Sequence, residues 1–251
     1  MPLPLYFLLP AKKGVPVLMY HKVCDTGADR LTVSPDILRQ HFTYLRDNGF
    51  RSLSLQEFLD MASGKIPADY RAFLLTFDDG YLNNFTLAYP LICSFGFKAV
   101  FFIIGNSLAP TAPAPAAGPD QKLSLADLRM LDPEIIQLAL HSYHHIDFSS
   151  ASLPAIQSDL EKNIEIARSS GLVFHKVLAY PYGARPHTAA AYRKLSLWMK
   201  DKGITAAFRI GNQPQKLPAP DMFAINRIDI WGTDRVREFS VKMKKGKLKP
   251  F

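Results

Sequence analysis

Cysteine is scarce in this sequence, with only Cys24 and Cys93 among 251 residues. Two cysteines cannot build a disulfide framework, and nothing in their surroundings marks them as metal ligands. The core must therefore rest on apolar packing. A hydrophobic fraction of 48% and a charged fraction of 21% are ordinary for a globular protein, and the length suffices for one large α/β domain.

Long hydrophobic runs are also absent. No stretch approaches the ~18 apolar residues that a membrane-spanning helix needs. Residues 1–13 lack a basic segment ahead of their apolar run and are interrupted by prolines, which makes them a poor secretory signal. We interpret residues 1–14 as an N-terminal arm and expect a cytoplasmic chain.

The sequence carries no nucleic-acid-binding motif, although its formal net charge is +8. Without a helix-turn-helix, zinc-finger or RNP pattern, the charge does not argue for nucleic acid. It favours an anionic neighbour, such as a membrane surface or an acidic glycan. Residues 235–251 contain seven basic residues and one acid, Glu238. We interpret them as a solvated basic tail, with peripheral contact to an anionic membrane or glycan as a second interpretation.

The most informative stretch is Phe73 to Tyr81, FLLTFDDGY, in which an apolar run ends in two adjacent carboxylates. Neighbouring strand residues point to opposite faces, and two adjacent carboxylates repel unless a cation or a shared proton compensates. Asp78 and Asp79 therefore indicate a functional strand end. The alternative is a plain turn, because Asp and Gly both favour turns.

A second apolar run, from Leu138, ends in three of the seven histidines, at His141, His144 and His145. Imidazoles with one carboxylate suit Zn²⁺, Fe²⁺, Co²⁺ or Ni²⁺ and leave positions open for water and substrate. The cluster therefore favours metal binding. For the isolated His41, His175 and His187, a structural role is the simpler interpretation.

Apolar runs alternate with helical patterns along residues 15–234, which predicts one α/β domain with a parallel sheet closed as a barrel. A third run ends in Tyr180-Pro181-Tyr182-Gly183, so three strand ends carry unusual chemistry at one rim. The expected strands cover residues 15–20, 72–77, 98–104, 135–140, 177–180, 205–208 and 224–230.

Three motifs in order resemble the polysaccharide deacetylase family with the NodB homology domain, carbohydrate esterase family 4. They are TFDDG from Thr76, HSYHH from His141 and YPYG from Tyr180. The resemblance covers residues 16–231 and implies a single distorted (β/α)7-type barrel.

The resemblance also implies roles for individual residues. Asp79, His141 and His145 would bind a divalent metal, with Zn²⁺ as first choice and Co²⁺, Ni²⁺ or Fe²⁺ compatible. Asp78 would be the general base that takes a proton from water. The backbone N–H of Tyr182 would stabilise the oxyanion, and its neighbours Pro181 and Tyr180 would complete the substrate-binding turn. His144 matches a variable position and stays outside the metal shell.

The sequence departs from the family pattern at two points. The third motif has Ala179 where an arginine is usual, and Arg227 could supply that charge to the base or be structural. The usual L-x-H motif with the acid histidine is missing after Gly183.

Leu18-Met19-Tyr20-His21 resembles the start of the poly-β-1,6-N-acetylglucosamine deacetylases, a circularly permuted branch whose acid histidine lies on the N-terminal strand. Closing a barrel places the first strand beside the last, so His21 could reach the pocket as general acid. The alternative is a strand-end histidine that contacts backbone.

The function that the resemblance implies is metal-dependent removal of N-acetyl groups from an aminosugar polysaccharide or glycan precursor. Two alternatives stay open: a catalytically silent glycan-binding protein, or the same chemistry on a formamido sugar or a small cyclic amide. The biofilm relatives act outside the cytoplasm, so the cell envelope or the exterior is the alternative location.

Overall fold

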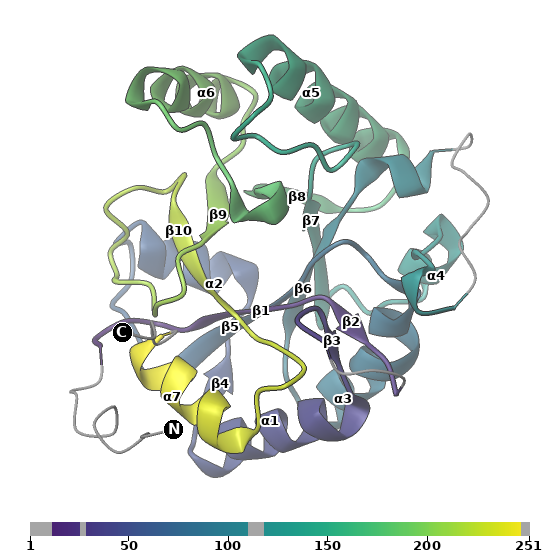
Figure 1. Cartoon of the computed structure of the whole chain (residues 1–251), viewed down its shortest axis with the longest axis vertical. Coiled ribbons are helices and arrows are strands. Elements are labelled where there is room, and N and C mark those ends of the chain that lie inside the picture. Colours follow the sequence, from purple (N-terminus) through teal and green to yellow (C-terminus); the bar gives the residue numbers. More distant parts are fainter. Residues whose placement is uncertain (1–11, 26–28, 110–117, 247–251) are drawn as a thin grey trace.

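A computed structural model of the chain describes residues 12–25, 29–109 and 118–246 (Figure 1). Seven parallel strands form a closed barrel, because the sheet runs from β1 through β10 to β5 and β5 pairs back onto β1. The predicted (β/α)7-type barrel is thus confirmed. The barrel strands are β1 (Val17–Tyr20), β5 (Ala72–Phe77), β6 (Ala99–Ile103), β7 (Ile136–Leu140), β8 (Phe174–Ala179), β9 (Ala206–Ile210) and β10 (Ile225–Asp229).

Helices surround the barrel (Figure 1). They are α1 (Pro35–Asp47), α2 (Leu55–Ala62), α3 (Tyr89–Ser94), α4 (Leu125–Arg129), α5 (Leu153–Ser169), α6 (Ala189–Asp201) and α7 (Val236–Lys245). Serine residues begin several of them: Ser34 caps α1, and Ser54 forms a capping box with Glu57 at the start of α2. The short strands are β2 (Lys22–Val23), β3 (Thr32–Val33) and β4 (Arg51–Ser52).

The helical segment between β5 and β6 is irregular. Residues Asn84–Ala88 form a π-helical turn, and only Tyr89–Ser94 continue as α3. Pro90, in the first turn of α3, has no N–H to donate to the preceding turn, which explains why the regular α-helix does not extend back through residues 84–88.

The barrel interior is apolar at its centre and polar at one end. Each of the seven strands contributes to one buried interior cluster: Val17, Leu74, Val100, Ala139, Val177, Ala206 and Ile225. Side chains on one face of a strand recur every second residue. Counting on from these interior residues therefore leads to further inward-facing positions: His21 after β1, Asp78 after β5, His141 after β7, and Arg227 and Asp229 in β10. The fold thus gathers polar side chains from distant strands at the carboxyl end.

The prediction of a solvated tail is wrong for residues 236–245, which form α7. Figure 1 shows α7 in yellow beside α1. Phe239 and Met243 of α7 are buried in the core cluster that includes residues of α1, and the Phe239 ring stacks on His41 at a centroid distance of 4.1 Å. Val236, Phe239 and Met243 follow helical spacing, and the lysines between them conceal this apolar face.

The predicted N-terminal arm, residues 1–14, lies mostly outside the described residues, as does the end of the basic segment after Gly246. In the described ranges, none of the helices combines the length and the apolar character that a membrane crossing requires.

Candidate active site

A cavity of about 520 Å³ opens at the carboxyl end of the barrel. It brings together most of the residues predicted from the three motifs and from the first strand. Those that line it are His21, Asp78, Asp79, His141, His145 and Tyr182.

Asp79, His141 and His145 form a compact group with the donor chemistry of a metal site. Their ligand atoms all lie within 4.8 Å of one another. Oδ1 of Asp79 is 3.2 Å from Nε2 of His141 and 3.3 Å from Nε2 of His145. That oxygen is buried, and it has no hydrogen-bond partner among the described residues. Two imidazoles and one carboxylate fit a divalent cation with open coordination positions.

The surroundings of the two histidines prepare them as ligands. Nδ1 of His141 lies 2.8 Å from the carbonyl oxygen of Ala179. A carbonyl only accepts, so Nδ1 carries the proton and Nε2 presents its lone pair towards Asp79. Burial, followed by the neighbouring His141, lowers the pKa of His145 to about 4. Its imidazole is therefore neutral near pH 7, which is the form that binds a metal.

Left-handed backbone conformations aim several side chains into the cavity. Asp79 has a φ of 72°, His145 of 56° and Tyr182 of 57°. Such values are uncommon for residues other than glycine, and they concentrate at functional sites. At Asp79 the conformation reverses the alternation of β5, so that Asp78 and Asp79 both line the same cavity.

Asp78 is buried and forms a two-pronged ion pair with Arg227. Nη1 of Arg227 donates to Oδ1 at 2.6 Å and Nη2 to Oδ2 at 2.7 Å. Burial would raise the pKa of Asp78, but the guanidinium and His141 outweigh it, so the pKa lies below its usual value. Arg227 is fully buried and also lies over the Phe102 ring. Arg227 of β10 thus supplies Asp78 with a guanidinium partner, a charge that the third motif lacks at Ala179.

His21 lies directly after β1, and its Nδ1 is buried without a hydrogen-bond partner among the described residues. Burial lowers its pKa, and the charges of Asp78, Asp79 and Asp229 oppose that shift only in part. A general acid that rests in its protonated form needs a pKa near or above the working pH, and the shift found for His21 has the opposite direction. Desolvation inside the barrel is the reason.

The third motif is only partly at the cavity. Tyr182 lines it, and its ring lies 4.6 Å from that of His145. Tyr180 is fully buried, packs against Phe148 and donates its hydroxyl to the carbonyl of Phe223 at 3.0 Å. Pro181 is buried and is not among the lining residues. The prediction that Tyr180 contacts the substrate is wrong. Side chains along β8 point alternately inward and outward, and Tyr180 points outward to the surrounding helices.

His144 points away from the metal-binding group. Its Nδ1 and its backbone N–H both lie 2.9 Å from Oδ1 of Asp159 in α5, and the N–H of Tyr143 donates to the other oxygen of that carboxylate. Asp159 thus fixes the loop between His141 and His145.

Several residues that line the cavity were not predicted, and Asp229 and Arg30 are two of them. Asp229 is two residues after Arg227 on the same face of β10, so the strand period could have identified it. Arg30 lies on the loop before β3 and donates to Oδ2 of Asp229 from Nε at 3.2 Å and Nη2 at 2.9 Å. No local sequence signal marks Arg30, because its partner is about two hundred residues away.

Comparison with known sequences gives one family. The model of the family described as polysaccharide deacetylase matches residues 65–198, which is more than half of the chain. YxkH of Bacillus subtilis (strain 168), a protein named for this family, is 26% identical over 226 residues, which are 88% of this chain and 72% of YxkH. The poly-β-1,6-N-acetyl-D-glucosamine N-deacetylase of Escherichia coli (strain K12) is 33% identical over 95 residues, 37% of this chain but only 14% of that protein.

Comparison of structures agrees on the fold. The structure of IcaB from Ammonifex degensii matches with a TM-score of 0.75 and 21% identity, over 93% of this chain and 97% of that one.

Proposed function

Because the chain belongs to the polysaccharide deacetylase family, we propose that it is a metal-dependent hydrolase that removes N-acetyl groups from an aminosugar glycan. The observation that carries this proposal is the position of Asp78. It lies beside the metal-binding group but outside it, and Arg227 keeps it ionised. A metal site that serves only structure has no use for such a carboxylate, so the arrangement favours an enzyme over a silent glycan-binding protein.

The residues divide the work of amide hydrolysis. Asp79, His141 and His145 would hold a divalent cation, which would lower the pKa of water and polarise the acyl carbonyl. Asp78 takes the proton of the attacking water, because it is ionised and lies 3.9 Å from the ligand atom of His141. The backbone N–H of Tyr182, a residue that lines the cavity, would stabilise the developing oxyanion. His21 hands a proton to the leaving amine. Arg227 keeps Asp78 charged and holds both of its oxygens.

The similarity to a poly-β-1,6-N-acetyl-D-glucosamine N-deacetylase supports a β-1,6-linked N-acetylglucosamine polymer or its precursor as substrate. The first strand supports the same branch, since it carries the candidate acid His21. A polymer substrate needs an open binding surface, and the cavity lies at the open carboxyl end of the barrel.

We expect the purified protein to release acetate from N-acetylglucosamine oligomers, and a chelator to abolish the release until Zn²⁺ is added back. Acetate is measured enzymatically over time with and without chelator. The release of formate from a formamido sugar, without acetate from any oligomer, would move the proposal to that substrate. If metal-loaded protein turns over no acylated amine, the proposed hydrolase is refuted and the silent glycan-binding protein is the remaining interpretation.

The metal itself gives a second test. Protein purified without added metal should contain about one divalent ion per chain, with Zn²⁺ as the first choice. His141→Ala should lose nearly all of it, because Nε2 of His141 lies within the three-residue group. His144→Ala is the matched control, since its imidazole is bound to Asp159. Elemental analysis decides, and a parental metal content in His141→Ala would refute the ligand assignment.

A further inference from the structure

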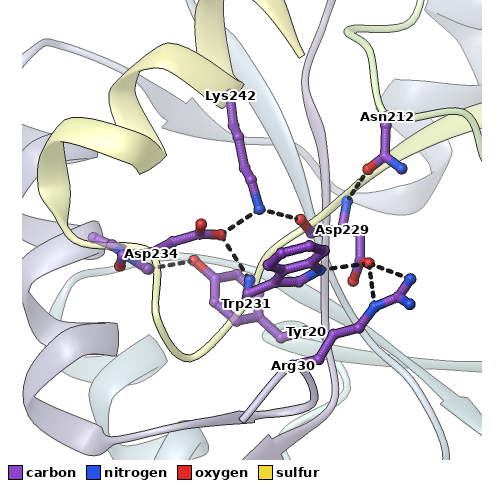
Figure 2. Close-up of polar contacts among 8 residues, drawn as sticks. Tyr20, Arg30, Asn212, Asp229, Trp231, Asp234 and Lys242 are labelled. Atoms are coloured by element: carbon purple, nitrogen blue, oxygen red, sulfur yellow. Dashed lines mark hydrogen bonds and ion pairs between the residues drawn. The ribbon is translucent and has the colours of Figure 1, made fainter. Parts of the chain in front are cut away.

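Lys242 of α7 connects the C-terminal helix to one wall of the active-site cavity (Figure 2). Its ammonium group donates to the carbonyl oxygen of Asp229 at 2.8 Å and also to Oδ2 of Asp234. The same Oδ2 accepts the backbone N–H of Trp231 at 2.7 Å. One side chain from α7 thus holds both ends of the segment from Asp229 to Asp234, which continues β10.

This segment presents Asp229 to the cavity. Oδ2 of Asp229 accepts the indole N–H of Trp231 at 2.7 Å and the two bonds from Arg30, as Figure 2 shows. The Trp231 ring has the Arg30 guanidinium at 5.4 Å and the Lys242 ammonium at 4.7 Å from its centroid. We call Arg30, Asp229 and Trp231 the cavity wall. Arg30 and Asp229 line the cavity directly.

The segment packs too closely to tolerate much movement. The N–H of Gly232 donates to the carbonyl of Asp29 at 3.0 Å, and a Cβ at position 232 would lie 1.8 Å from the carbonyl oxygen of Thr32. The loop that carries Arg30 therefore rests directly on the segment. A displacement of the segment would move Arg30 and Asp229 together.

Packing of α7 does not by itself explain a buried lysine. Phe239 and Met243 already attach the helix to the core, and an apolar residue at position 242 would avoid the desolvation cost of an ammonium group. What a lysine adds is a fixed geometry for the two groups that it binds. Such a use of a buried charge, to select one arrangement, has precedents in other proteins.

We propose that Lys242 is a positioning residue, which holds Asp229 and Trp231 so that the cavity wall is preformed for the sugar next to the hydrolysed amide. This inference rests on the proposed function for its substrate. Lys242 does not itself line the cavity. It acts through the Asp229 carbonyl and through Asp234.

The test compares Lys242→Met with Lys244→Met, a matched control at an exposed position of the same helix. We expect Lys242→Met to lower kcat/KM on N-acetylglucosamine oligomers by about 10- to 100-fold, because small misplacements of positioning groups have effects of this size. Lys244→Met should keep the parental value. Metal content should be parental in both variants.

A double variant separates positioning from stability, because Lys242→Met alone leaves Asp234 buried without its cation. In Asp234→Asn/Lys242→Met no unpaired charge remains, and the asparagine oxygen can still accept the N–H of Trp231. We expect this variant to recover the parental Tm without recovering kcat/KM. Parental kcat/KM together with parental Tm would overturn the proposal, because the lysine would then serve stability alone.

A spectroscopic readout needs no substrate. The chain has two tryptophans, so in a Trp198→Phe background the fluorescence reports on Trp231 alone. Acrylamide quenching should increase in Lys242→Met and in the double variant, and stay parental in Lys244→Met. Unchanged quenching in both Lys242 variants would overturn the proposal. A parent protein without turnover would refute the proposed function, while the quenching would still decide the role of Lys242.

Discussion

Asp78→Asn is expected to lower kcat on acetylated oligomers by about 10²–10⁴-fold while the metal stays bound. A positioned general base contributes an effect of this size, and an amide cannot take the proton of the attacking water. Asp79, His141 and His145 are unchanged in this variant, so metal content should remain parental. Rates on oligomers and elemental analysis of the same preparation measure the two quantities.

A control is needed for stability, because Asp78→Asn leaves the buried Arg227 without its carboxylate partner. Removing one member of a buried ion pair costs about 3–5 kcal/mol, enough to compromise folding. Asp78→Asn/Arg227→Met removes both charges and should fold, bind metal and remain inactive. Asp79→Asn should instead lose the metal. Substantial activity in a metal-loaded, folded Asp78→Asn variant would mean that the base is another residue.

Much of the barrel could be predicted because its strands are short, buried and separated by capped helices. The residues 72–77 predicted from the apolar run before Asp78 are the observed β5, and Ser34 and Ser54 cap α1 and α2. Parallel strands in a barrel bring their carboxyl ends together, so motifs that follow different strands had to meet. Asp78 and His141 therefore share one cavity.

The conformation that turns neighbouring residues into the cavity could not be predicted from the sequence. Asp79 and His145 adopt left-handed backbone angles, and the surrounding fold must compensate for them. Aspartate and histidine adopt such angles more often than most residues other than glycine, but this preference is too weak to single out these two positions. The motifs identified the chemistry of these positions. They did not show how Asp78 and Asp79, adjacent residues at the end of a strand, can both reach the same cavity.

Contacts between residues that are far apart in the sequence could not be predicted either. Arg227 pairs with Asp78, which is 149 positions away in the sequence. The sequence left open whether Arg227 serves the base or the fold. The structure brings the two residues together because β1 lies between β5 and β10 in the barrel. The helix α7 was missed because a run of lysines and arginines resembles a solvated tail. Its buried Lys242 becomes intelligible only with Asp229 and Asp234 beside it. Charge pattern alone does not distinguish a buried lysine from an exposed one.

His21→Ala is expected to keep the metal and the fold and to lose most of kcat on an amide substrate, by about 10²–10⁴-fold. The closure of the barrel supports this, since β1 lies between β5 and β10 and delivers His21 to the cavity that holds Asp78. An amine leaves poorly unless it is protonated, whereas an activated ester needs no proton for its leaving group. The loss on such an ester should therefore be much smaller. His187→Ala, an exposed histidine outside the cavity, is the control and should be parental on both substrates. Equal losses on amide and ester, or no loss on the amide, would assign the proton transfer to another residue.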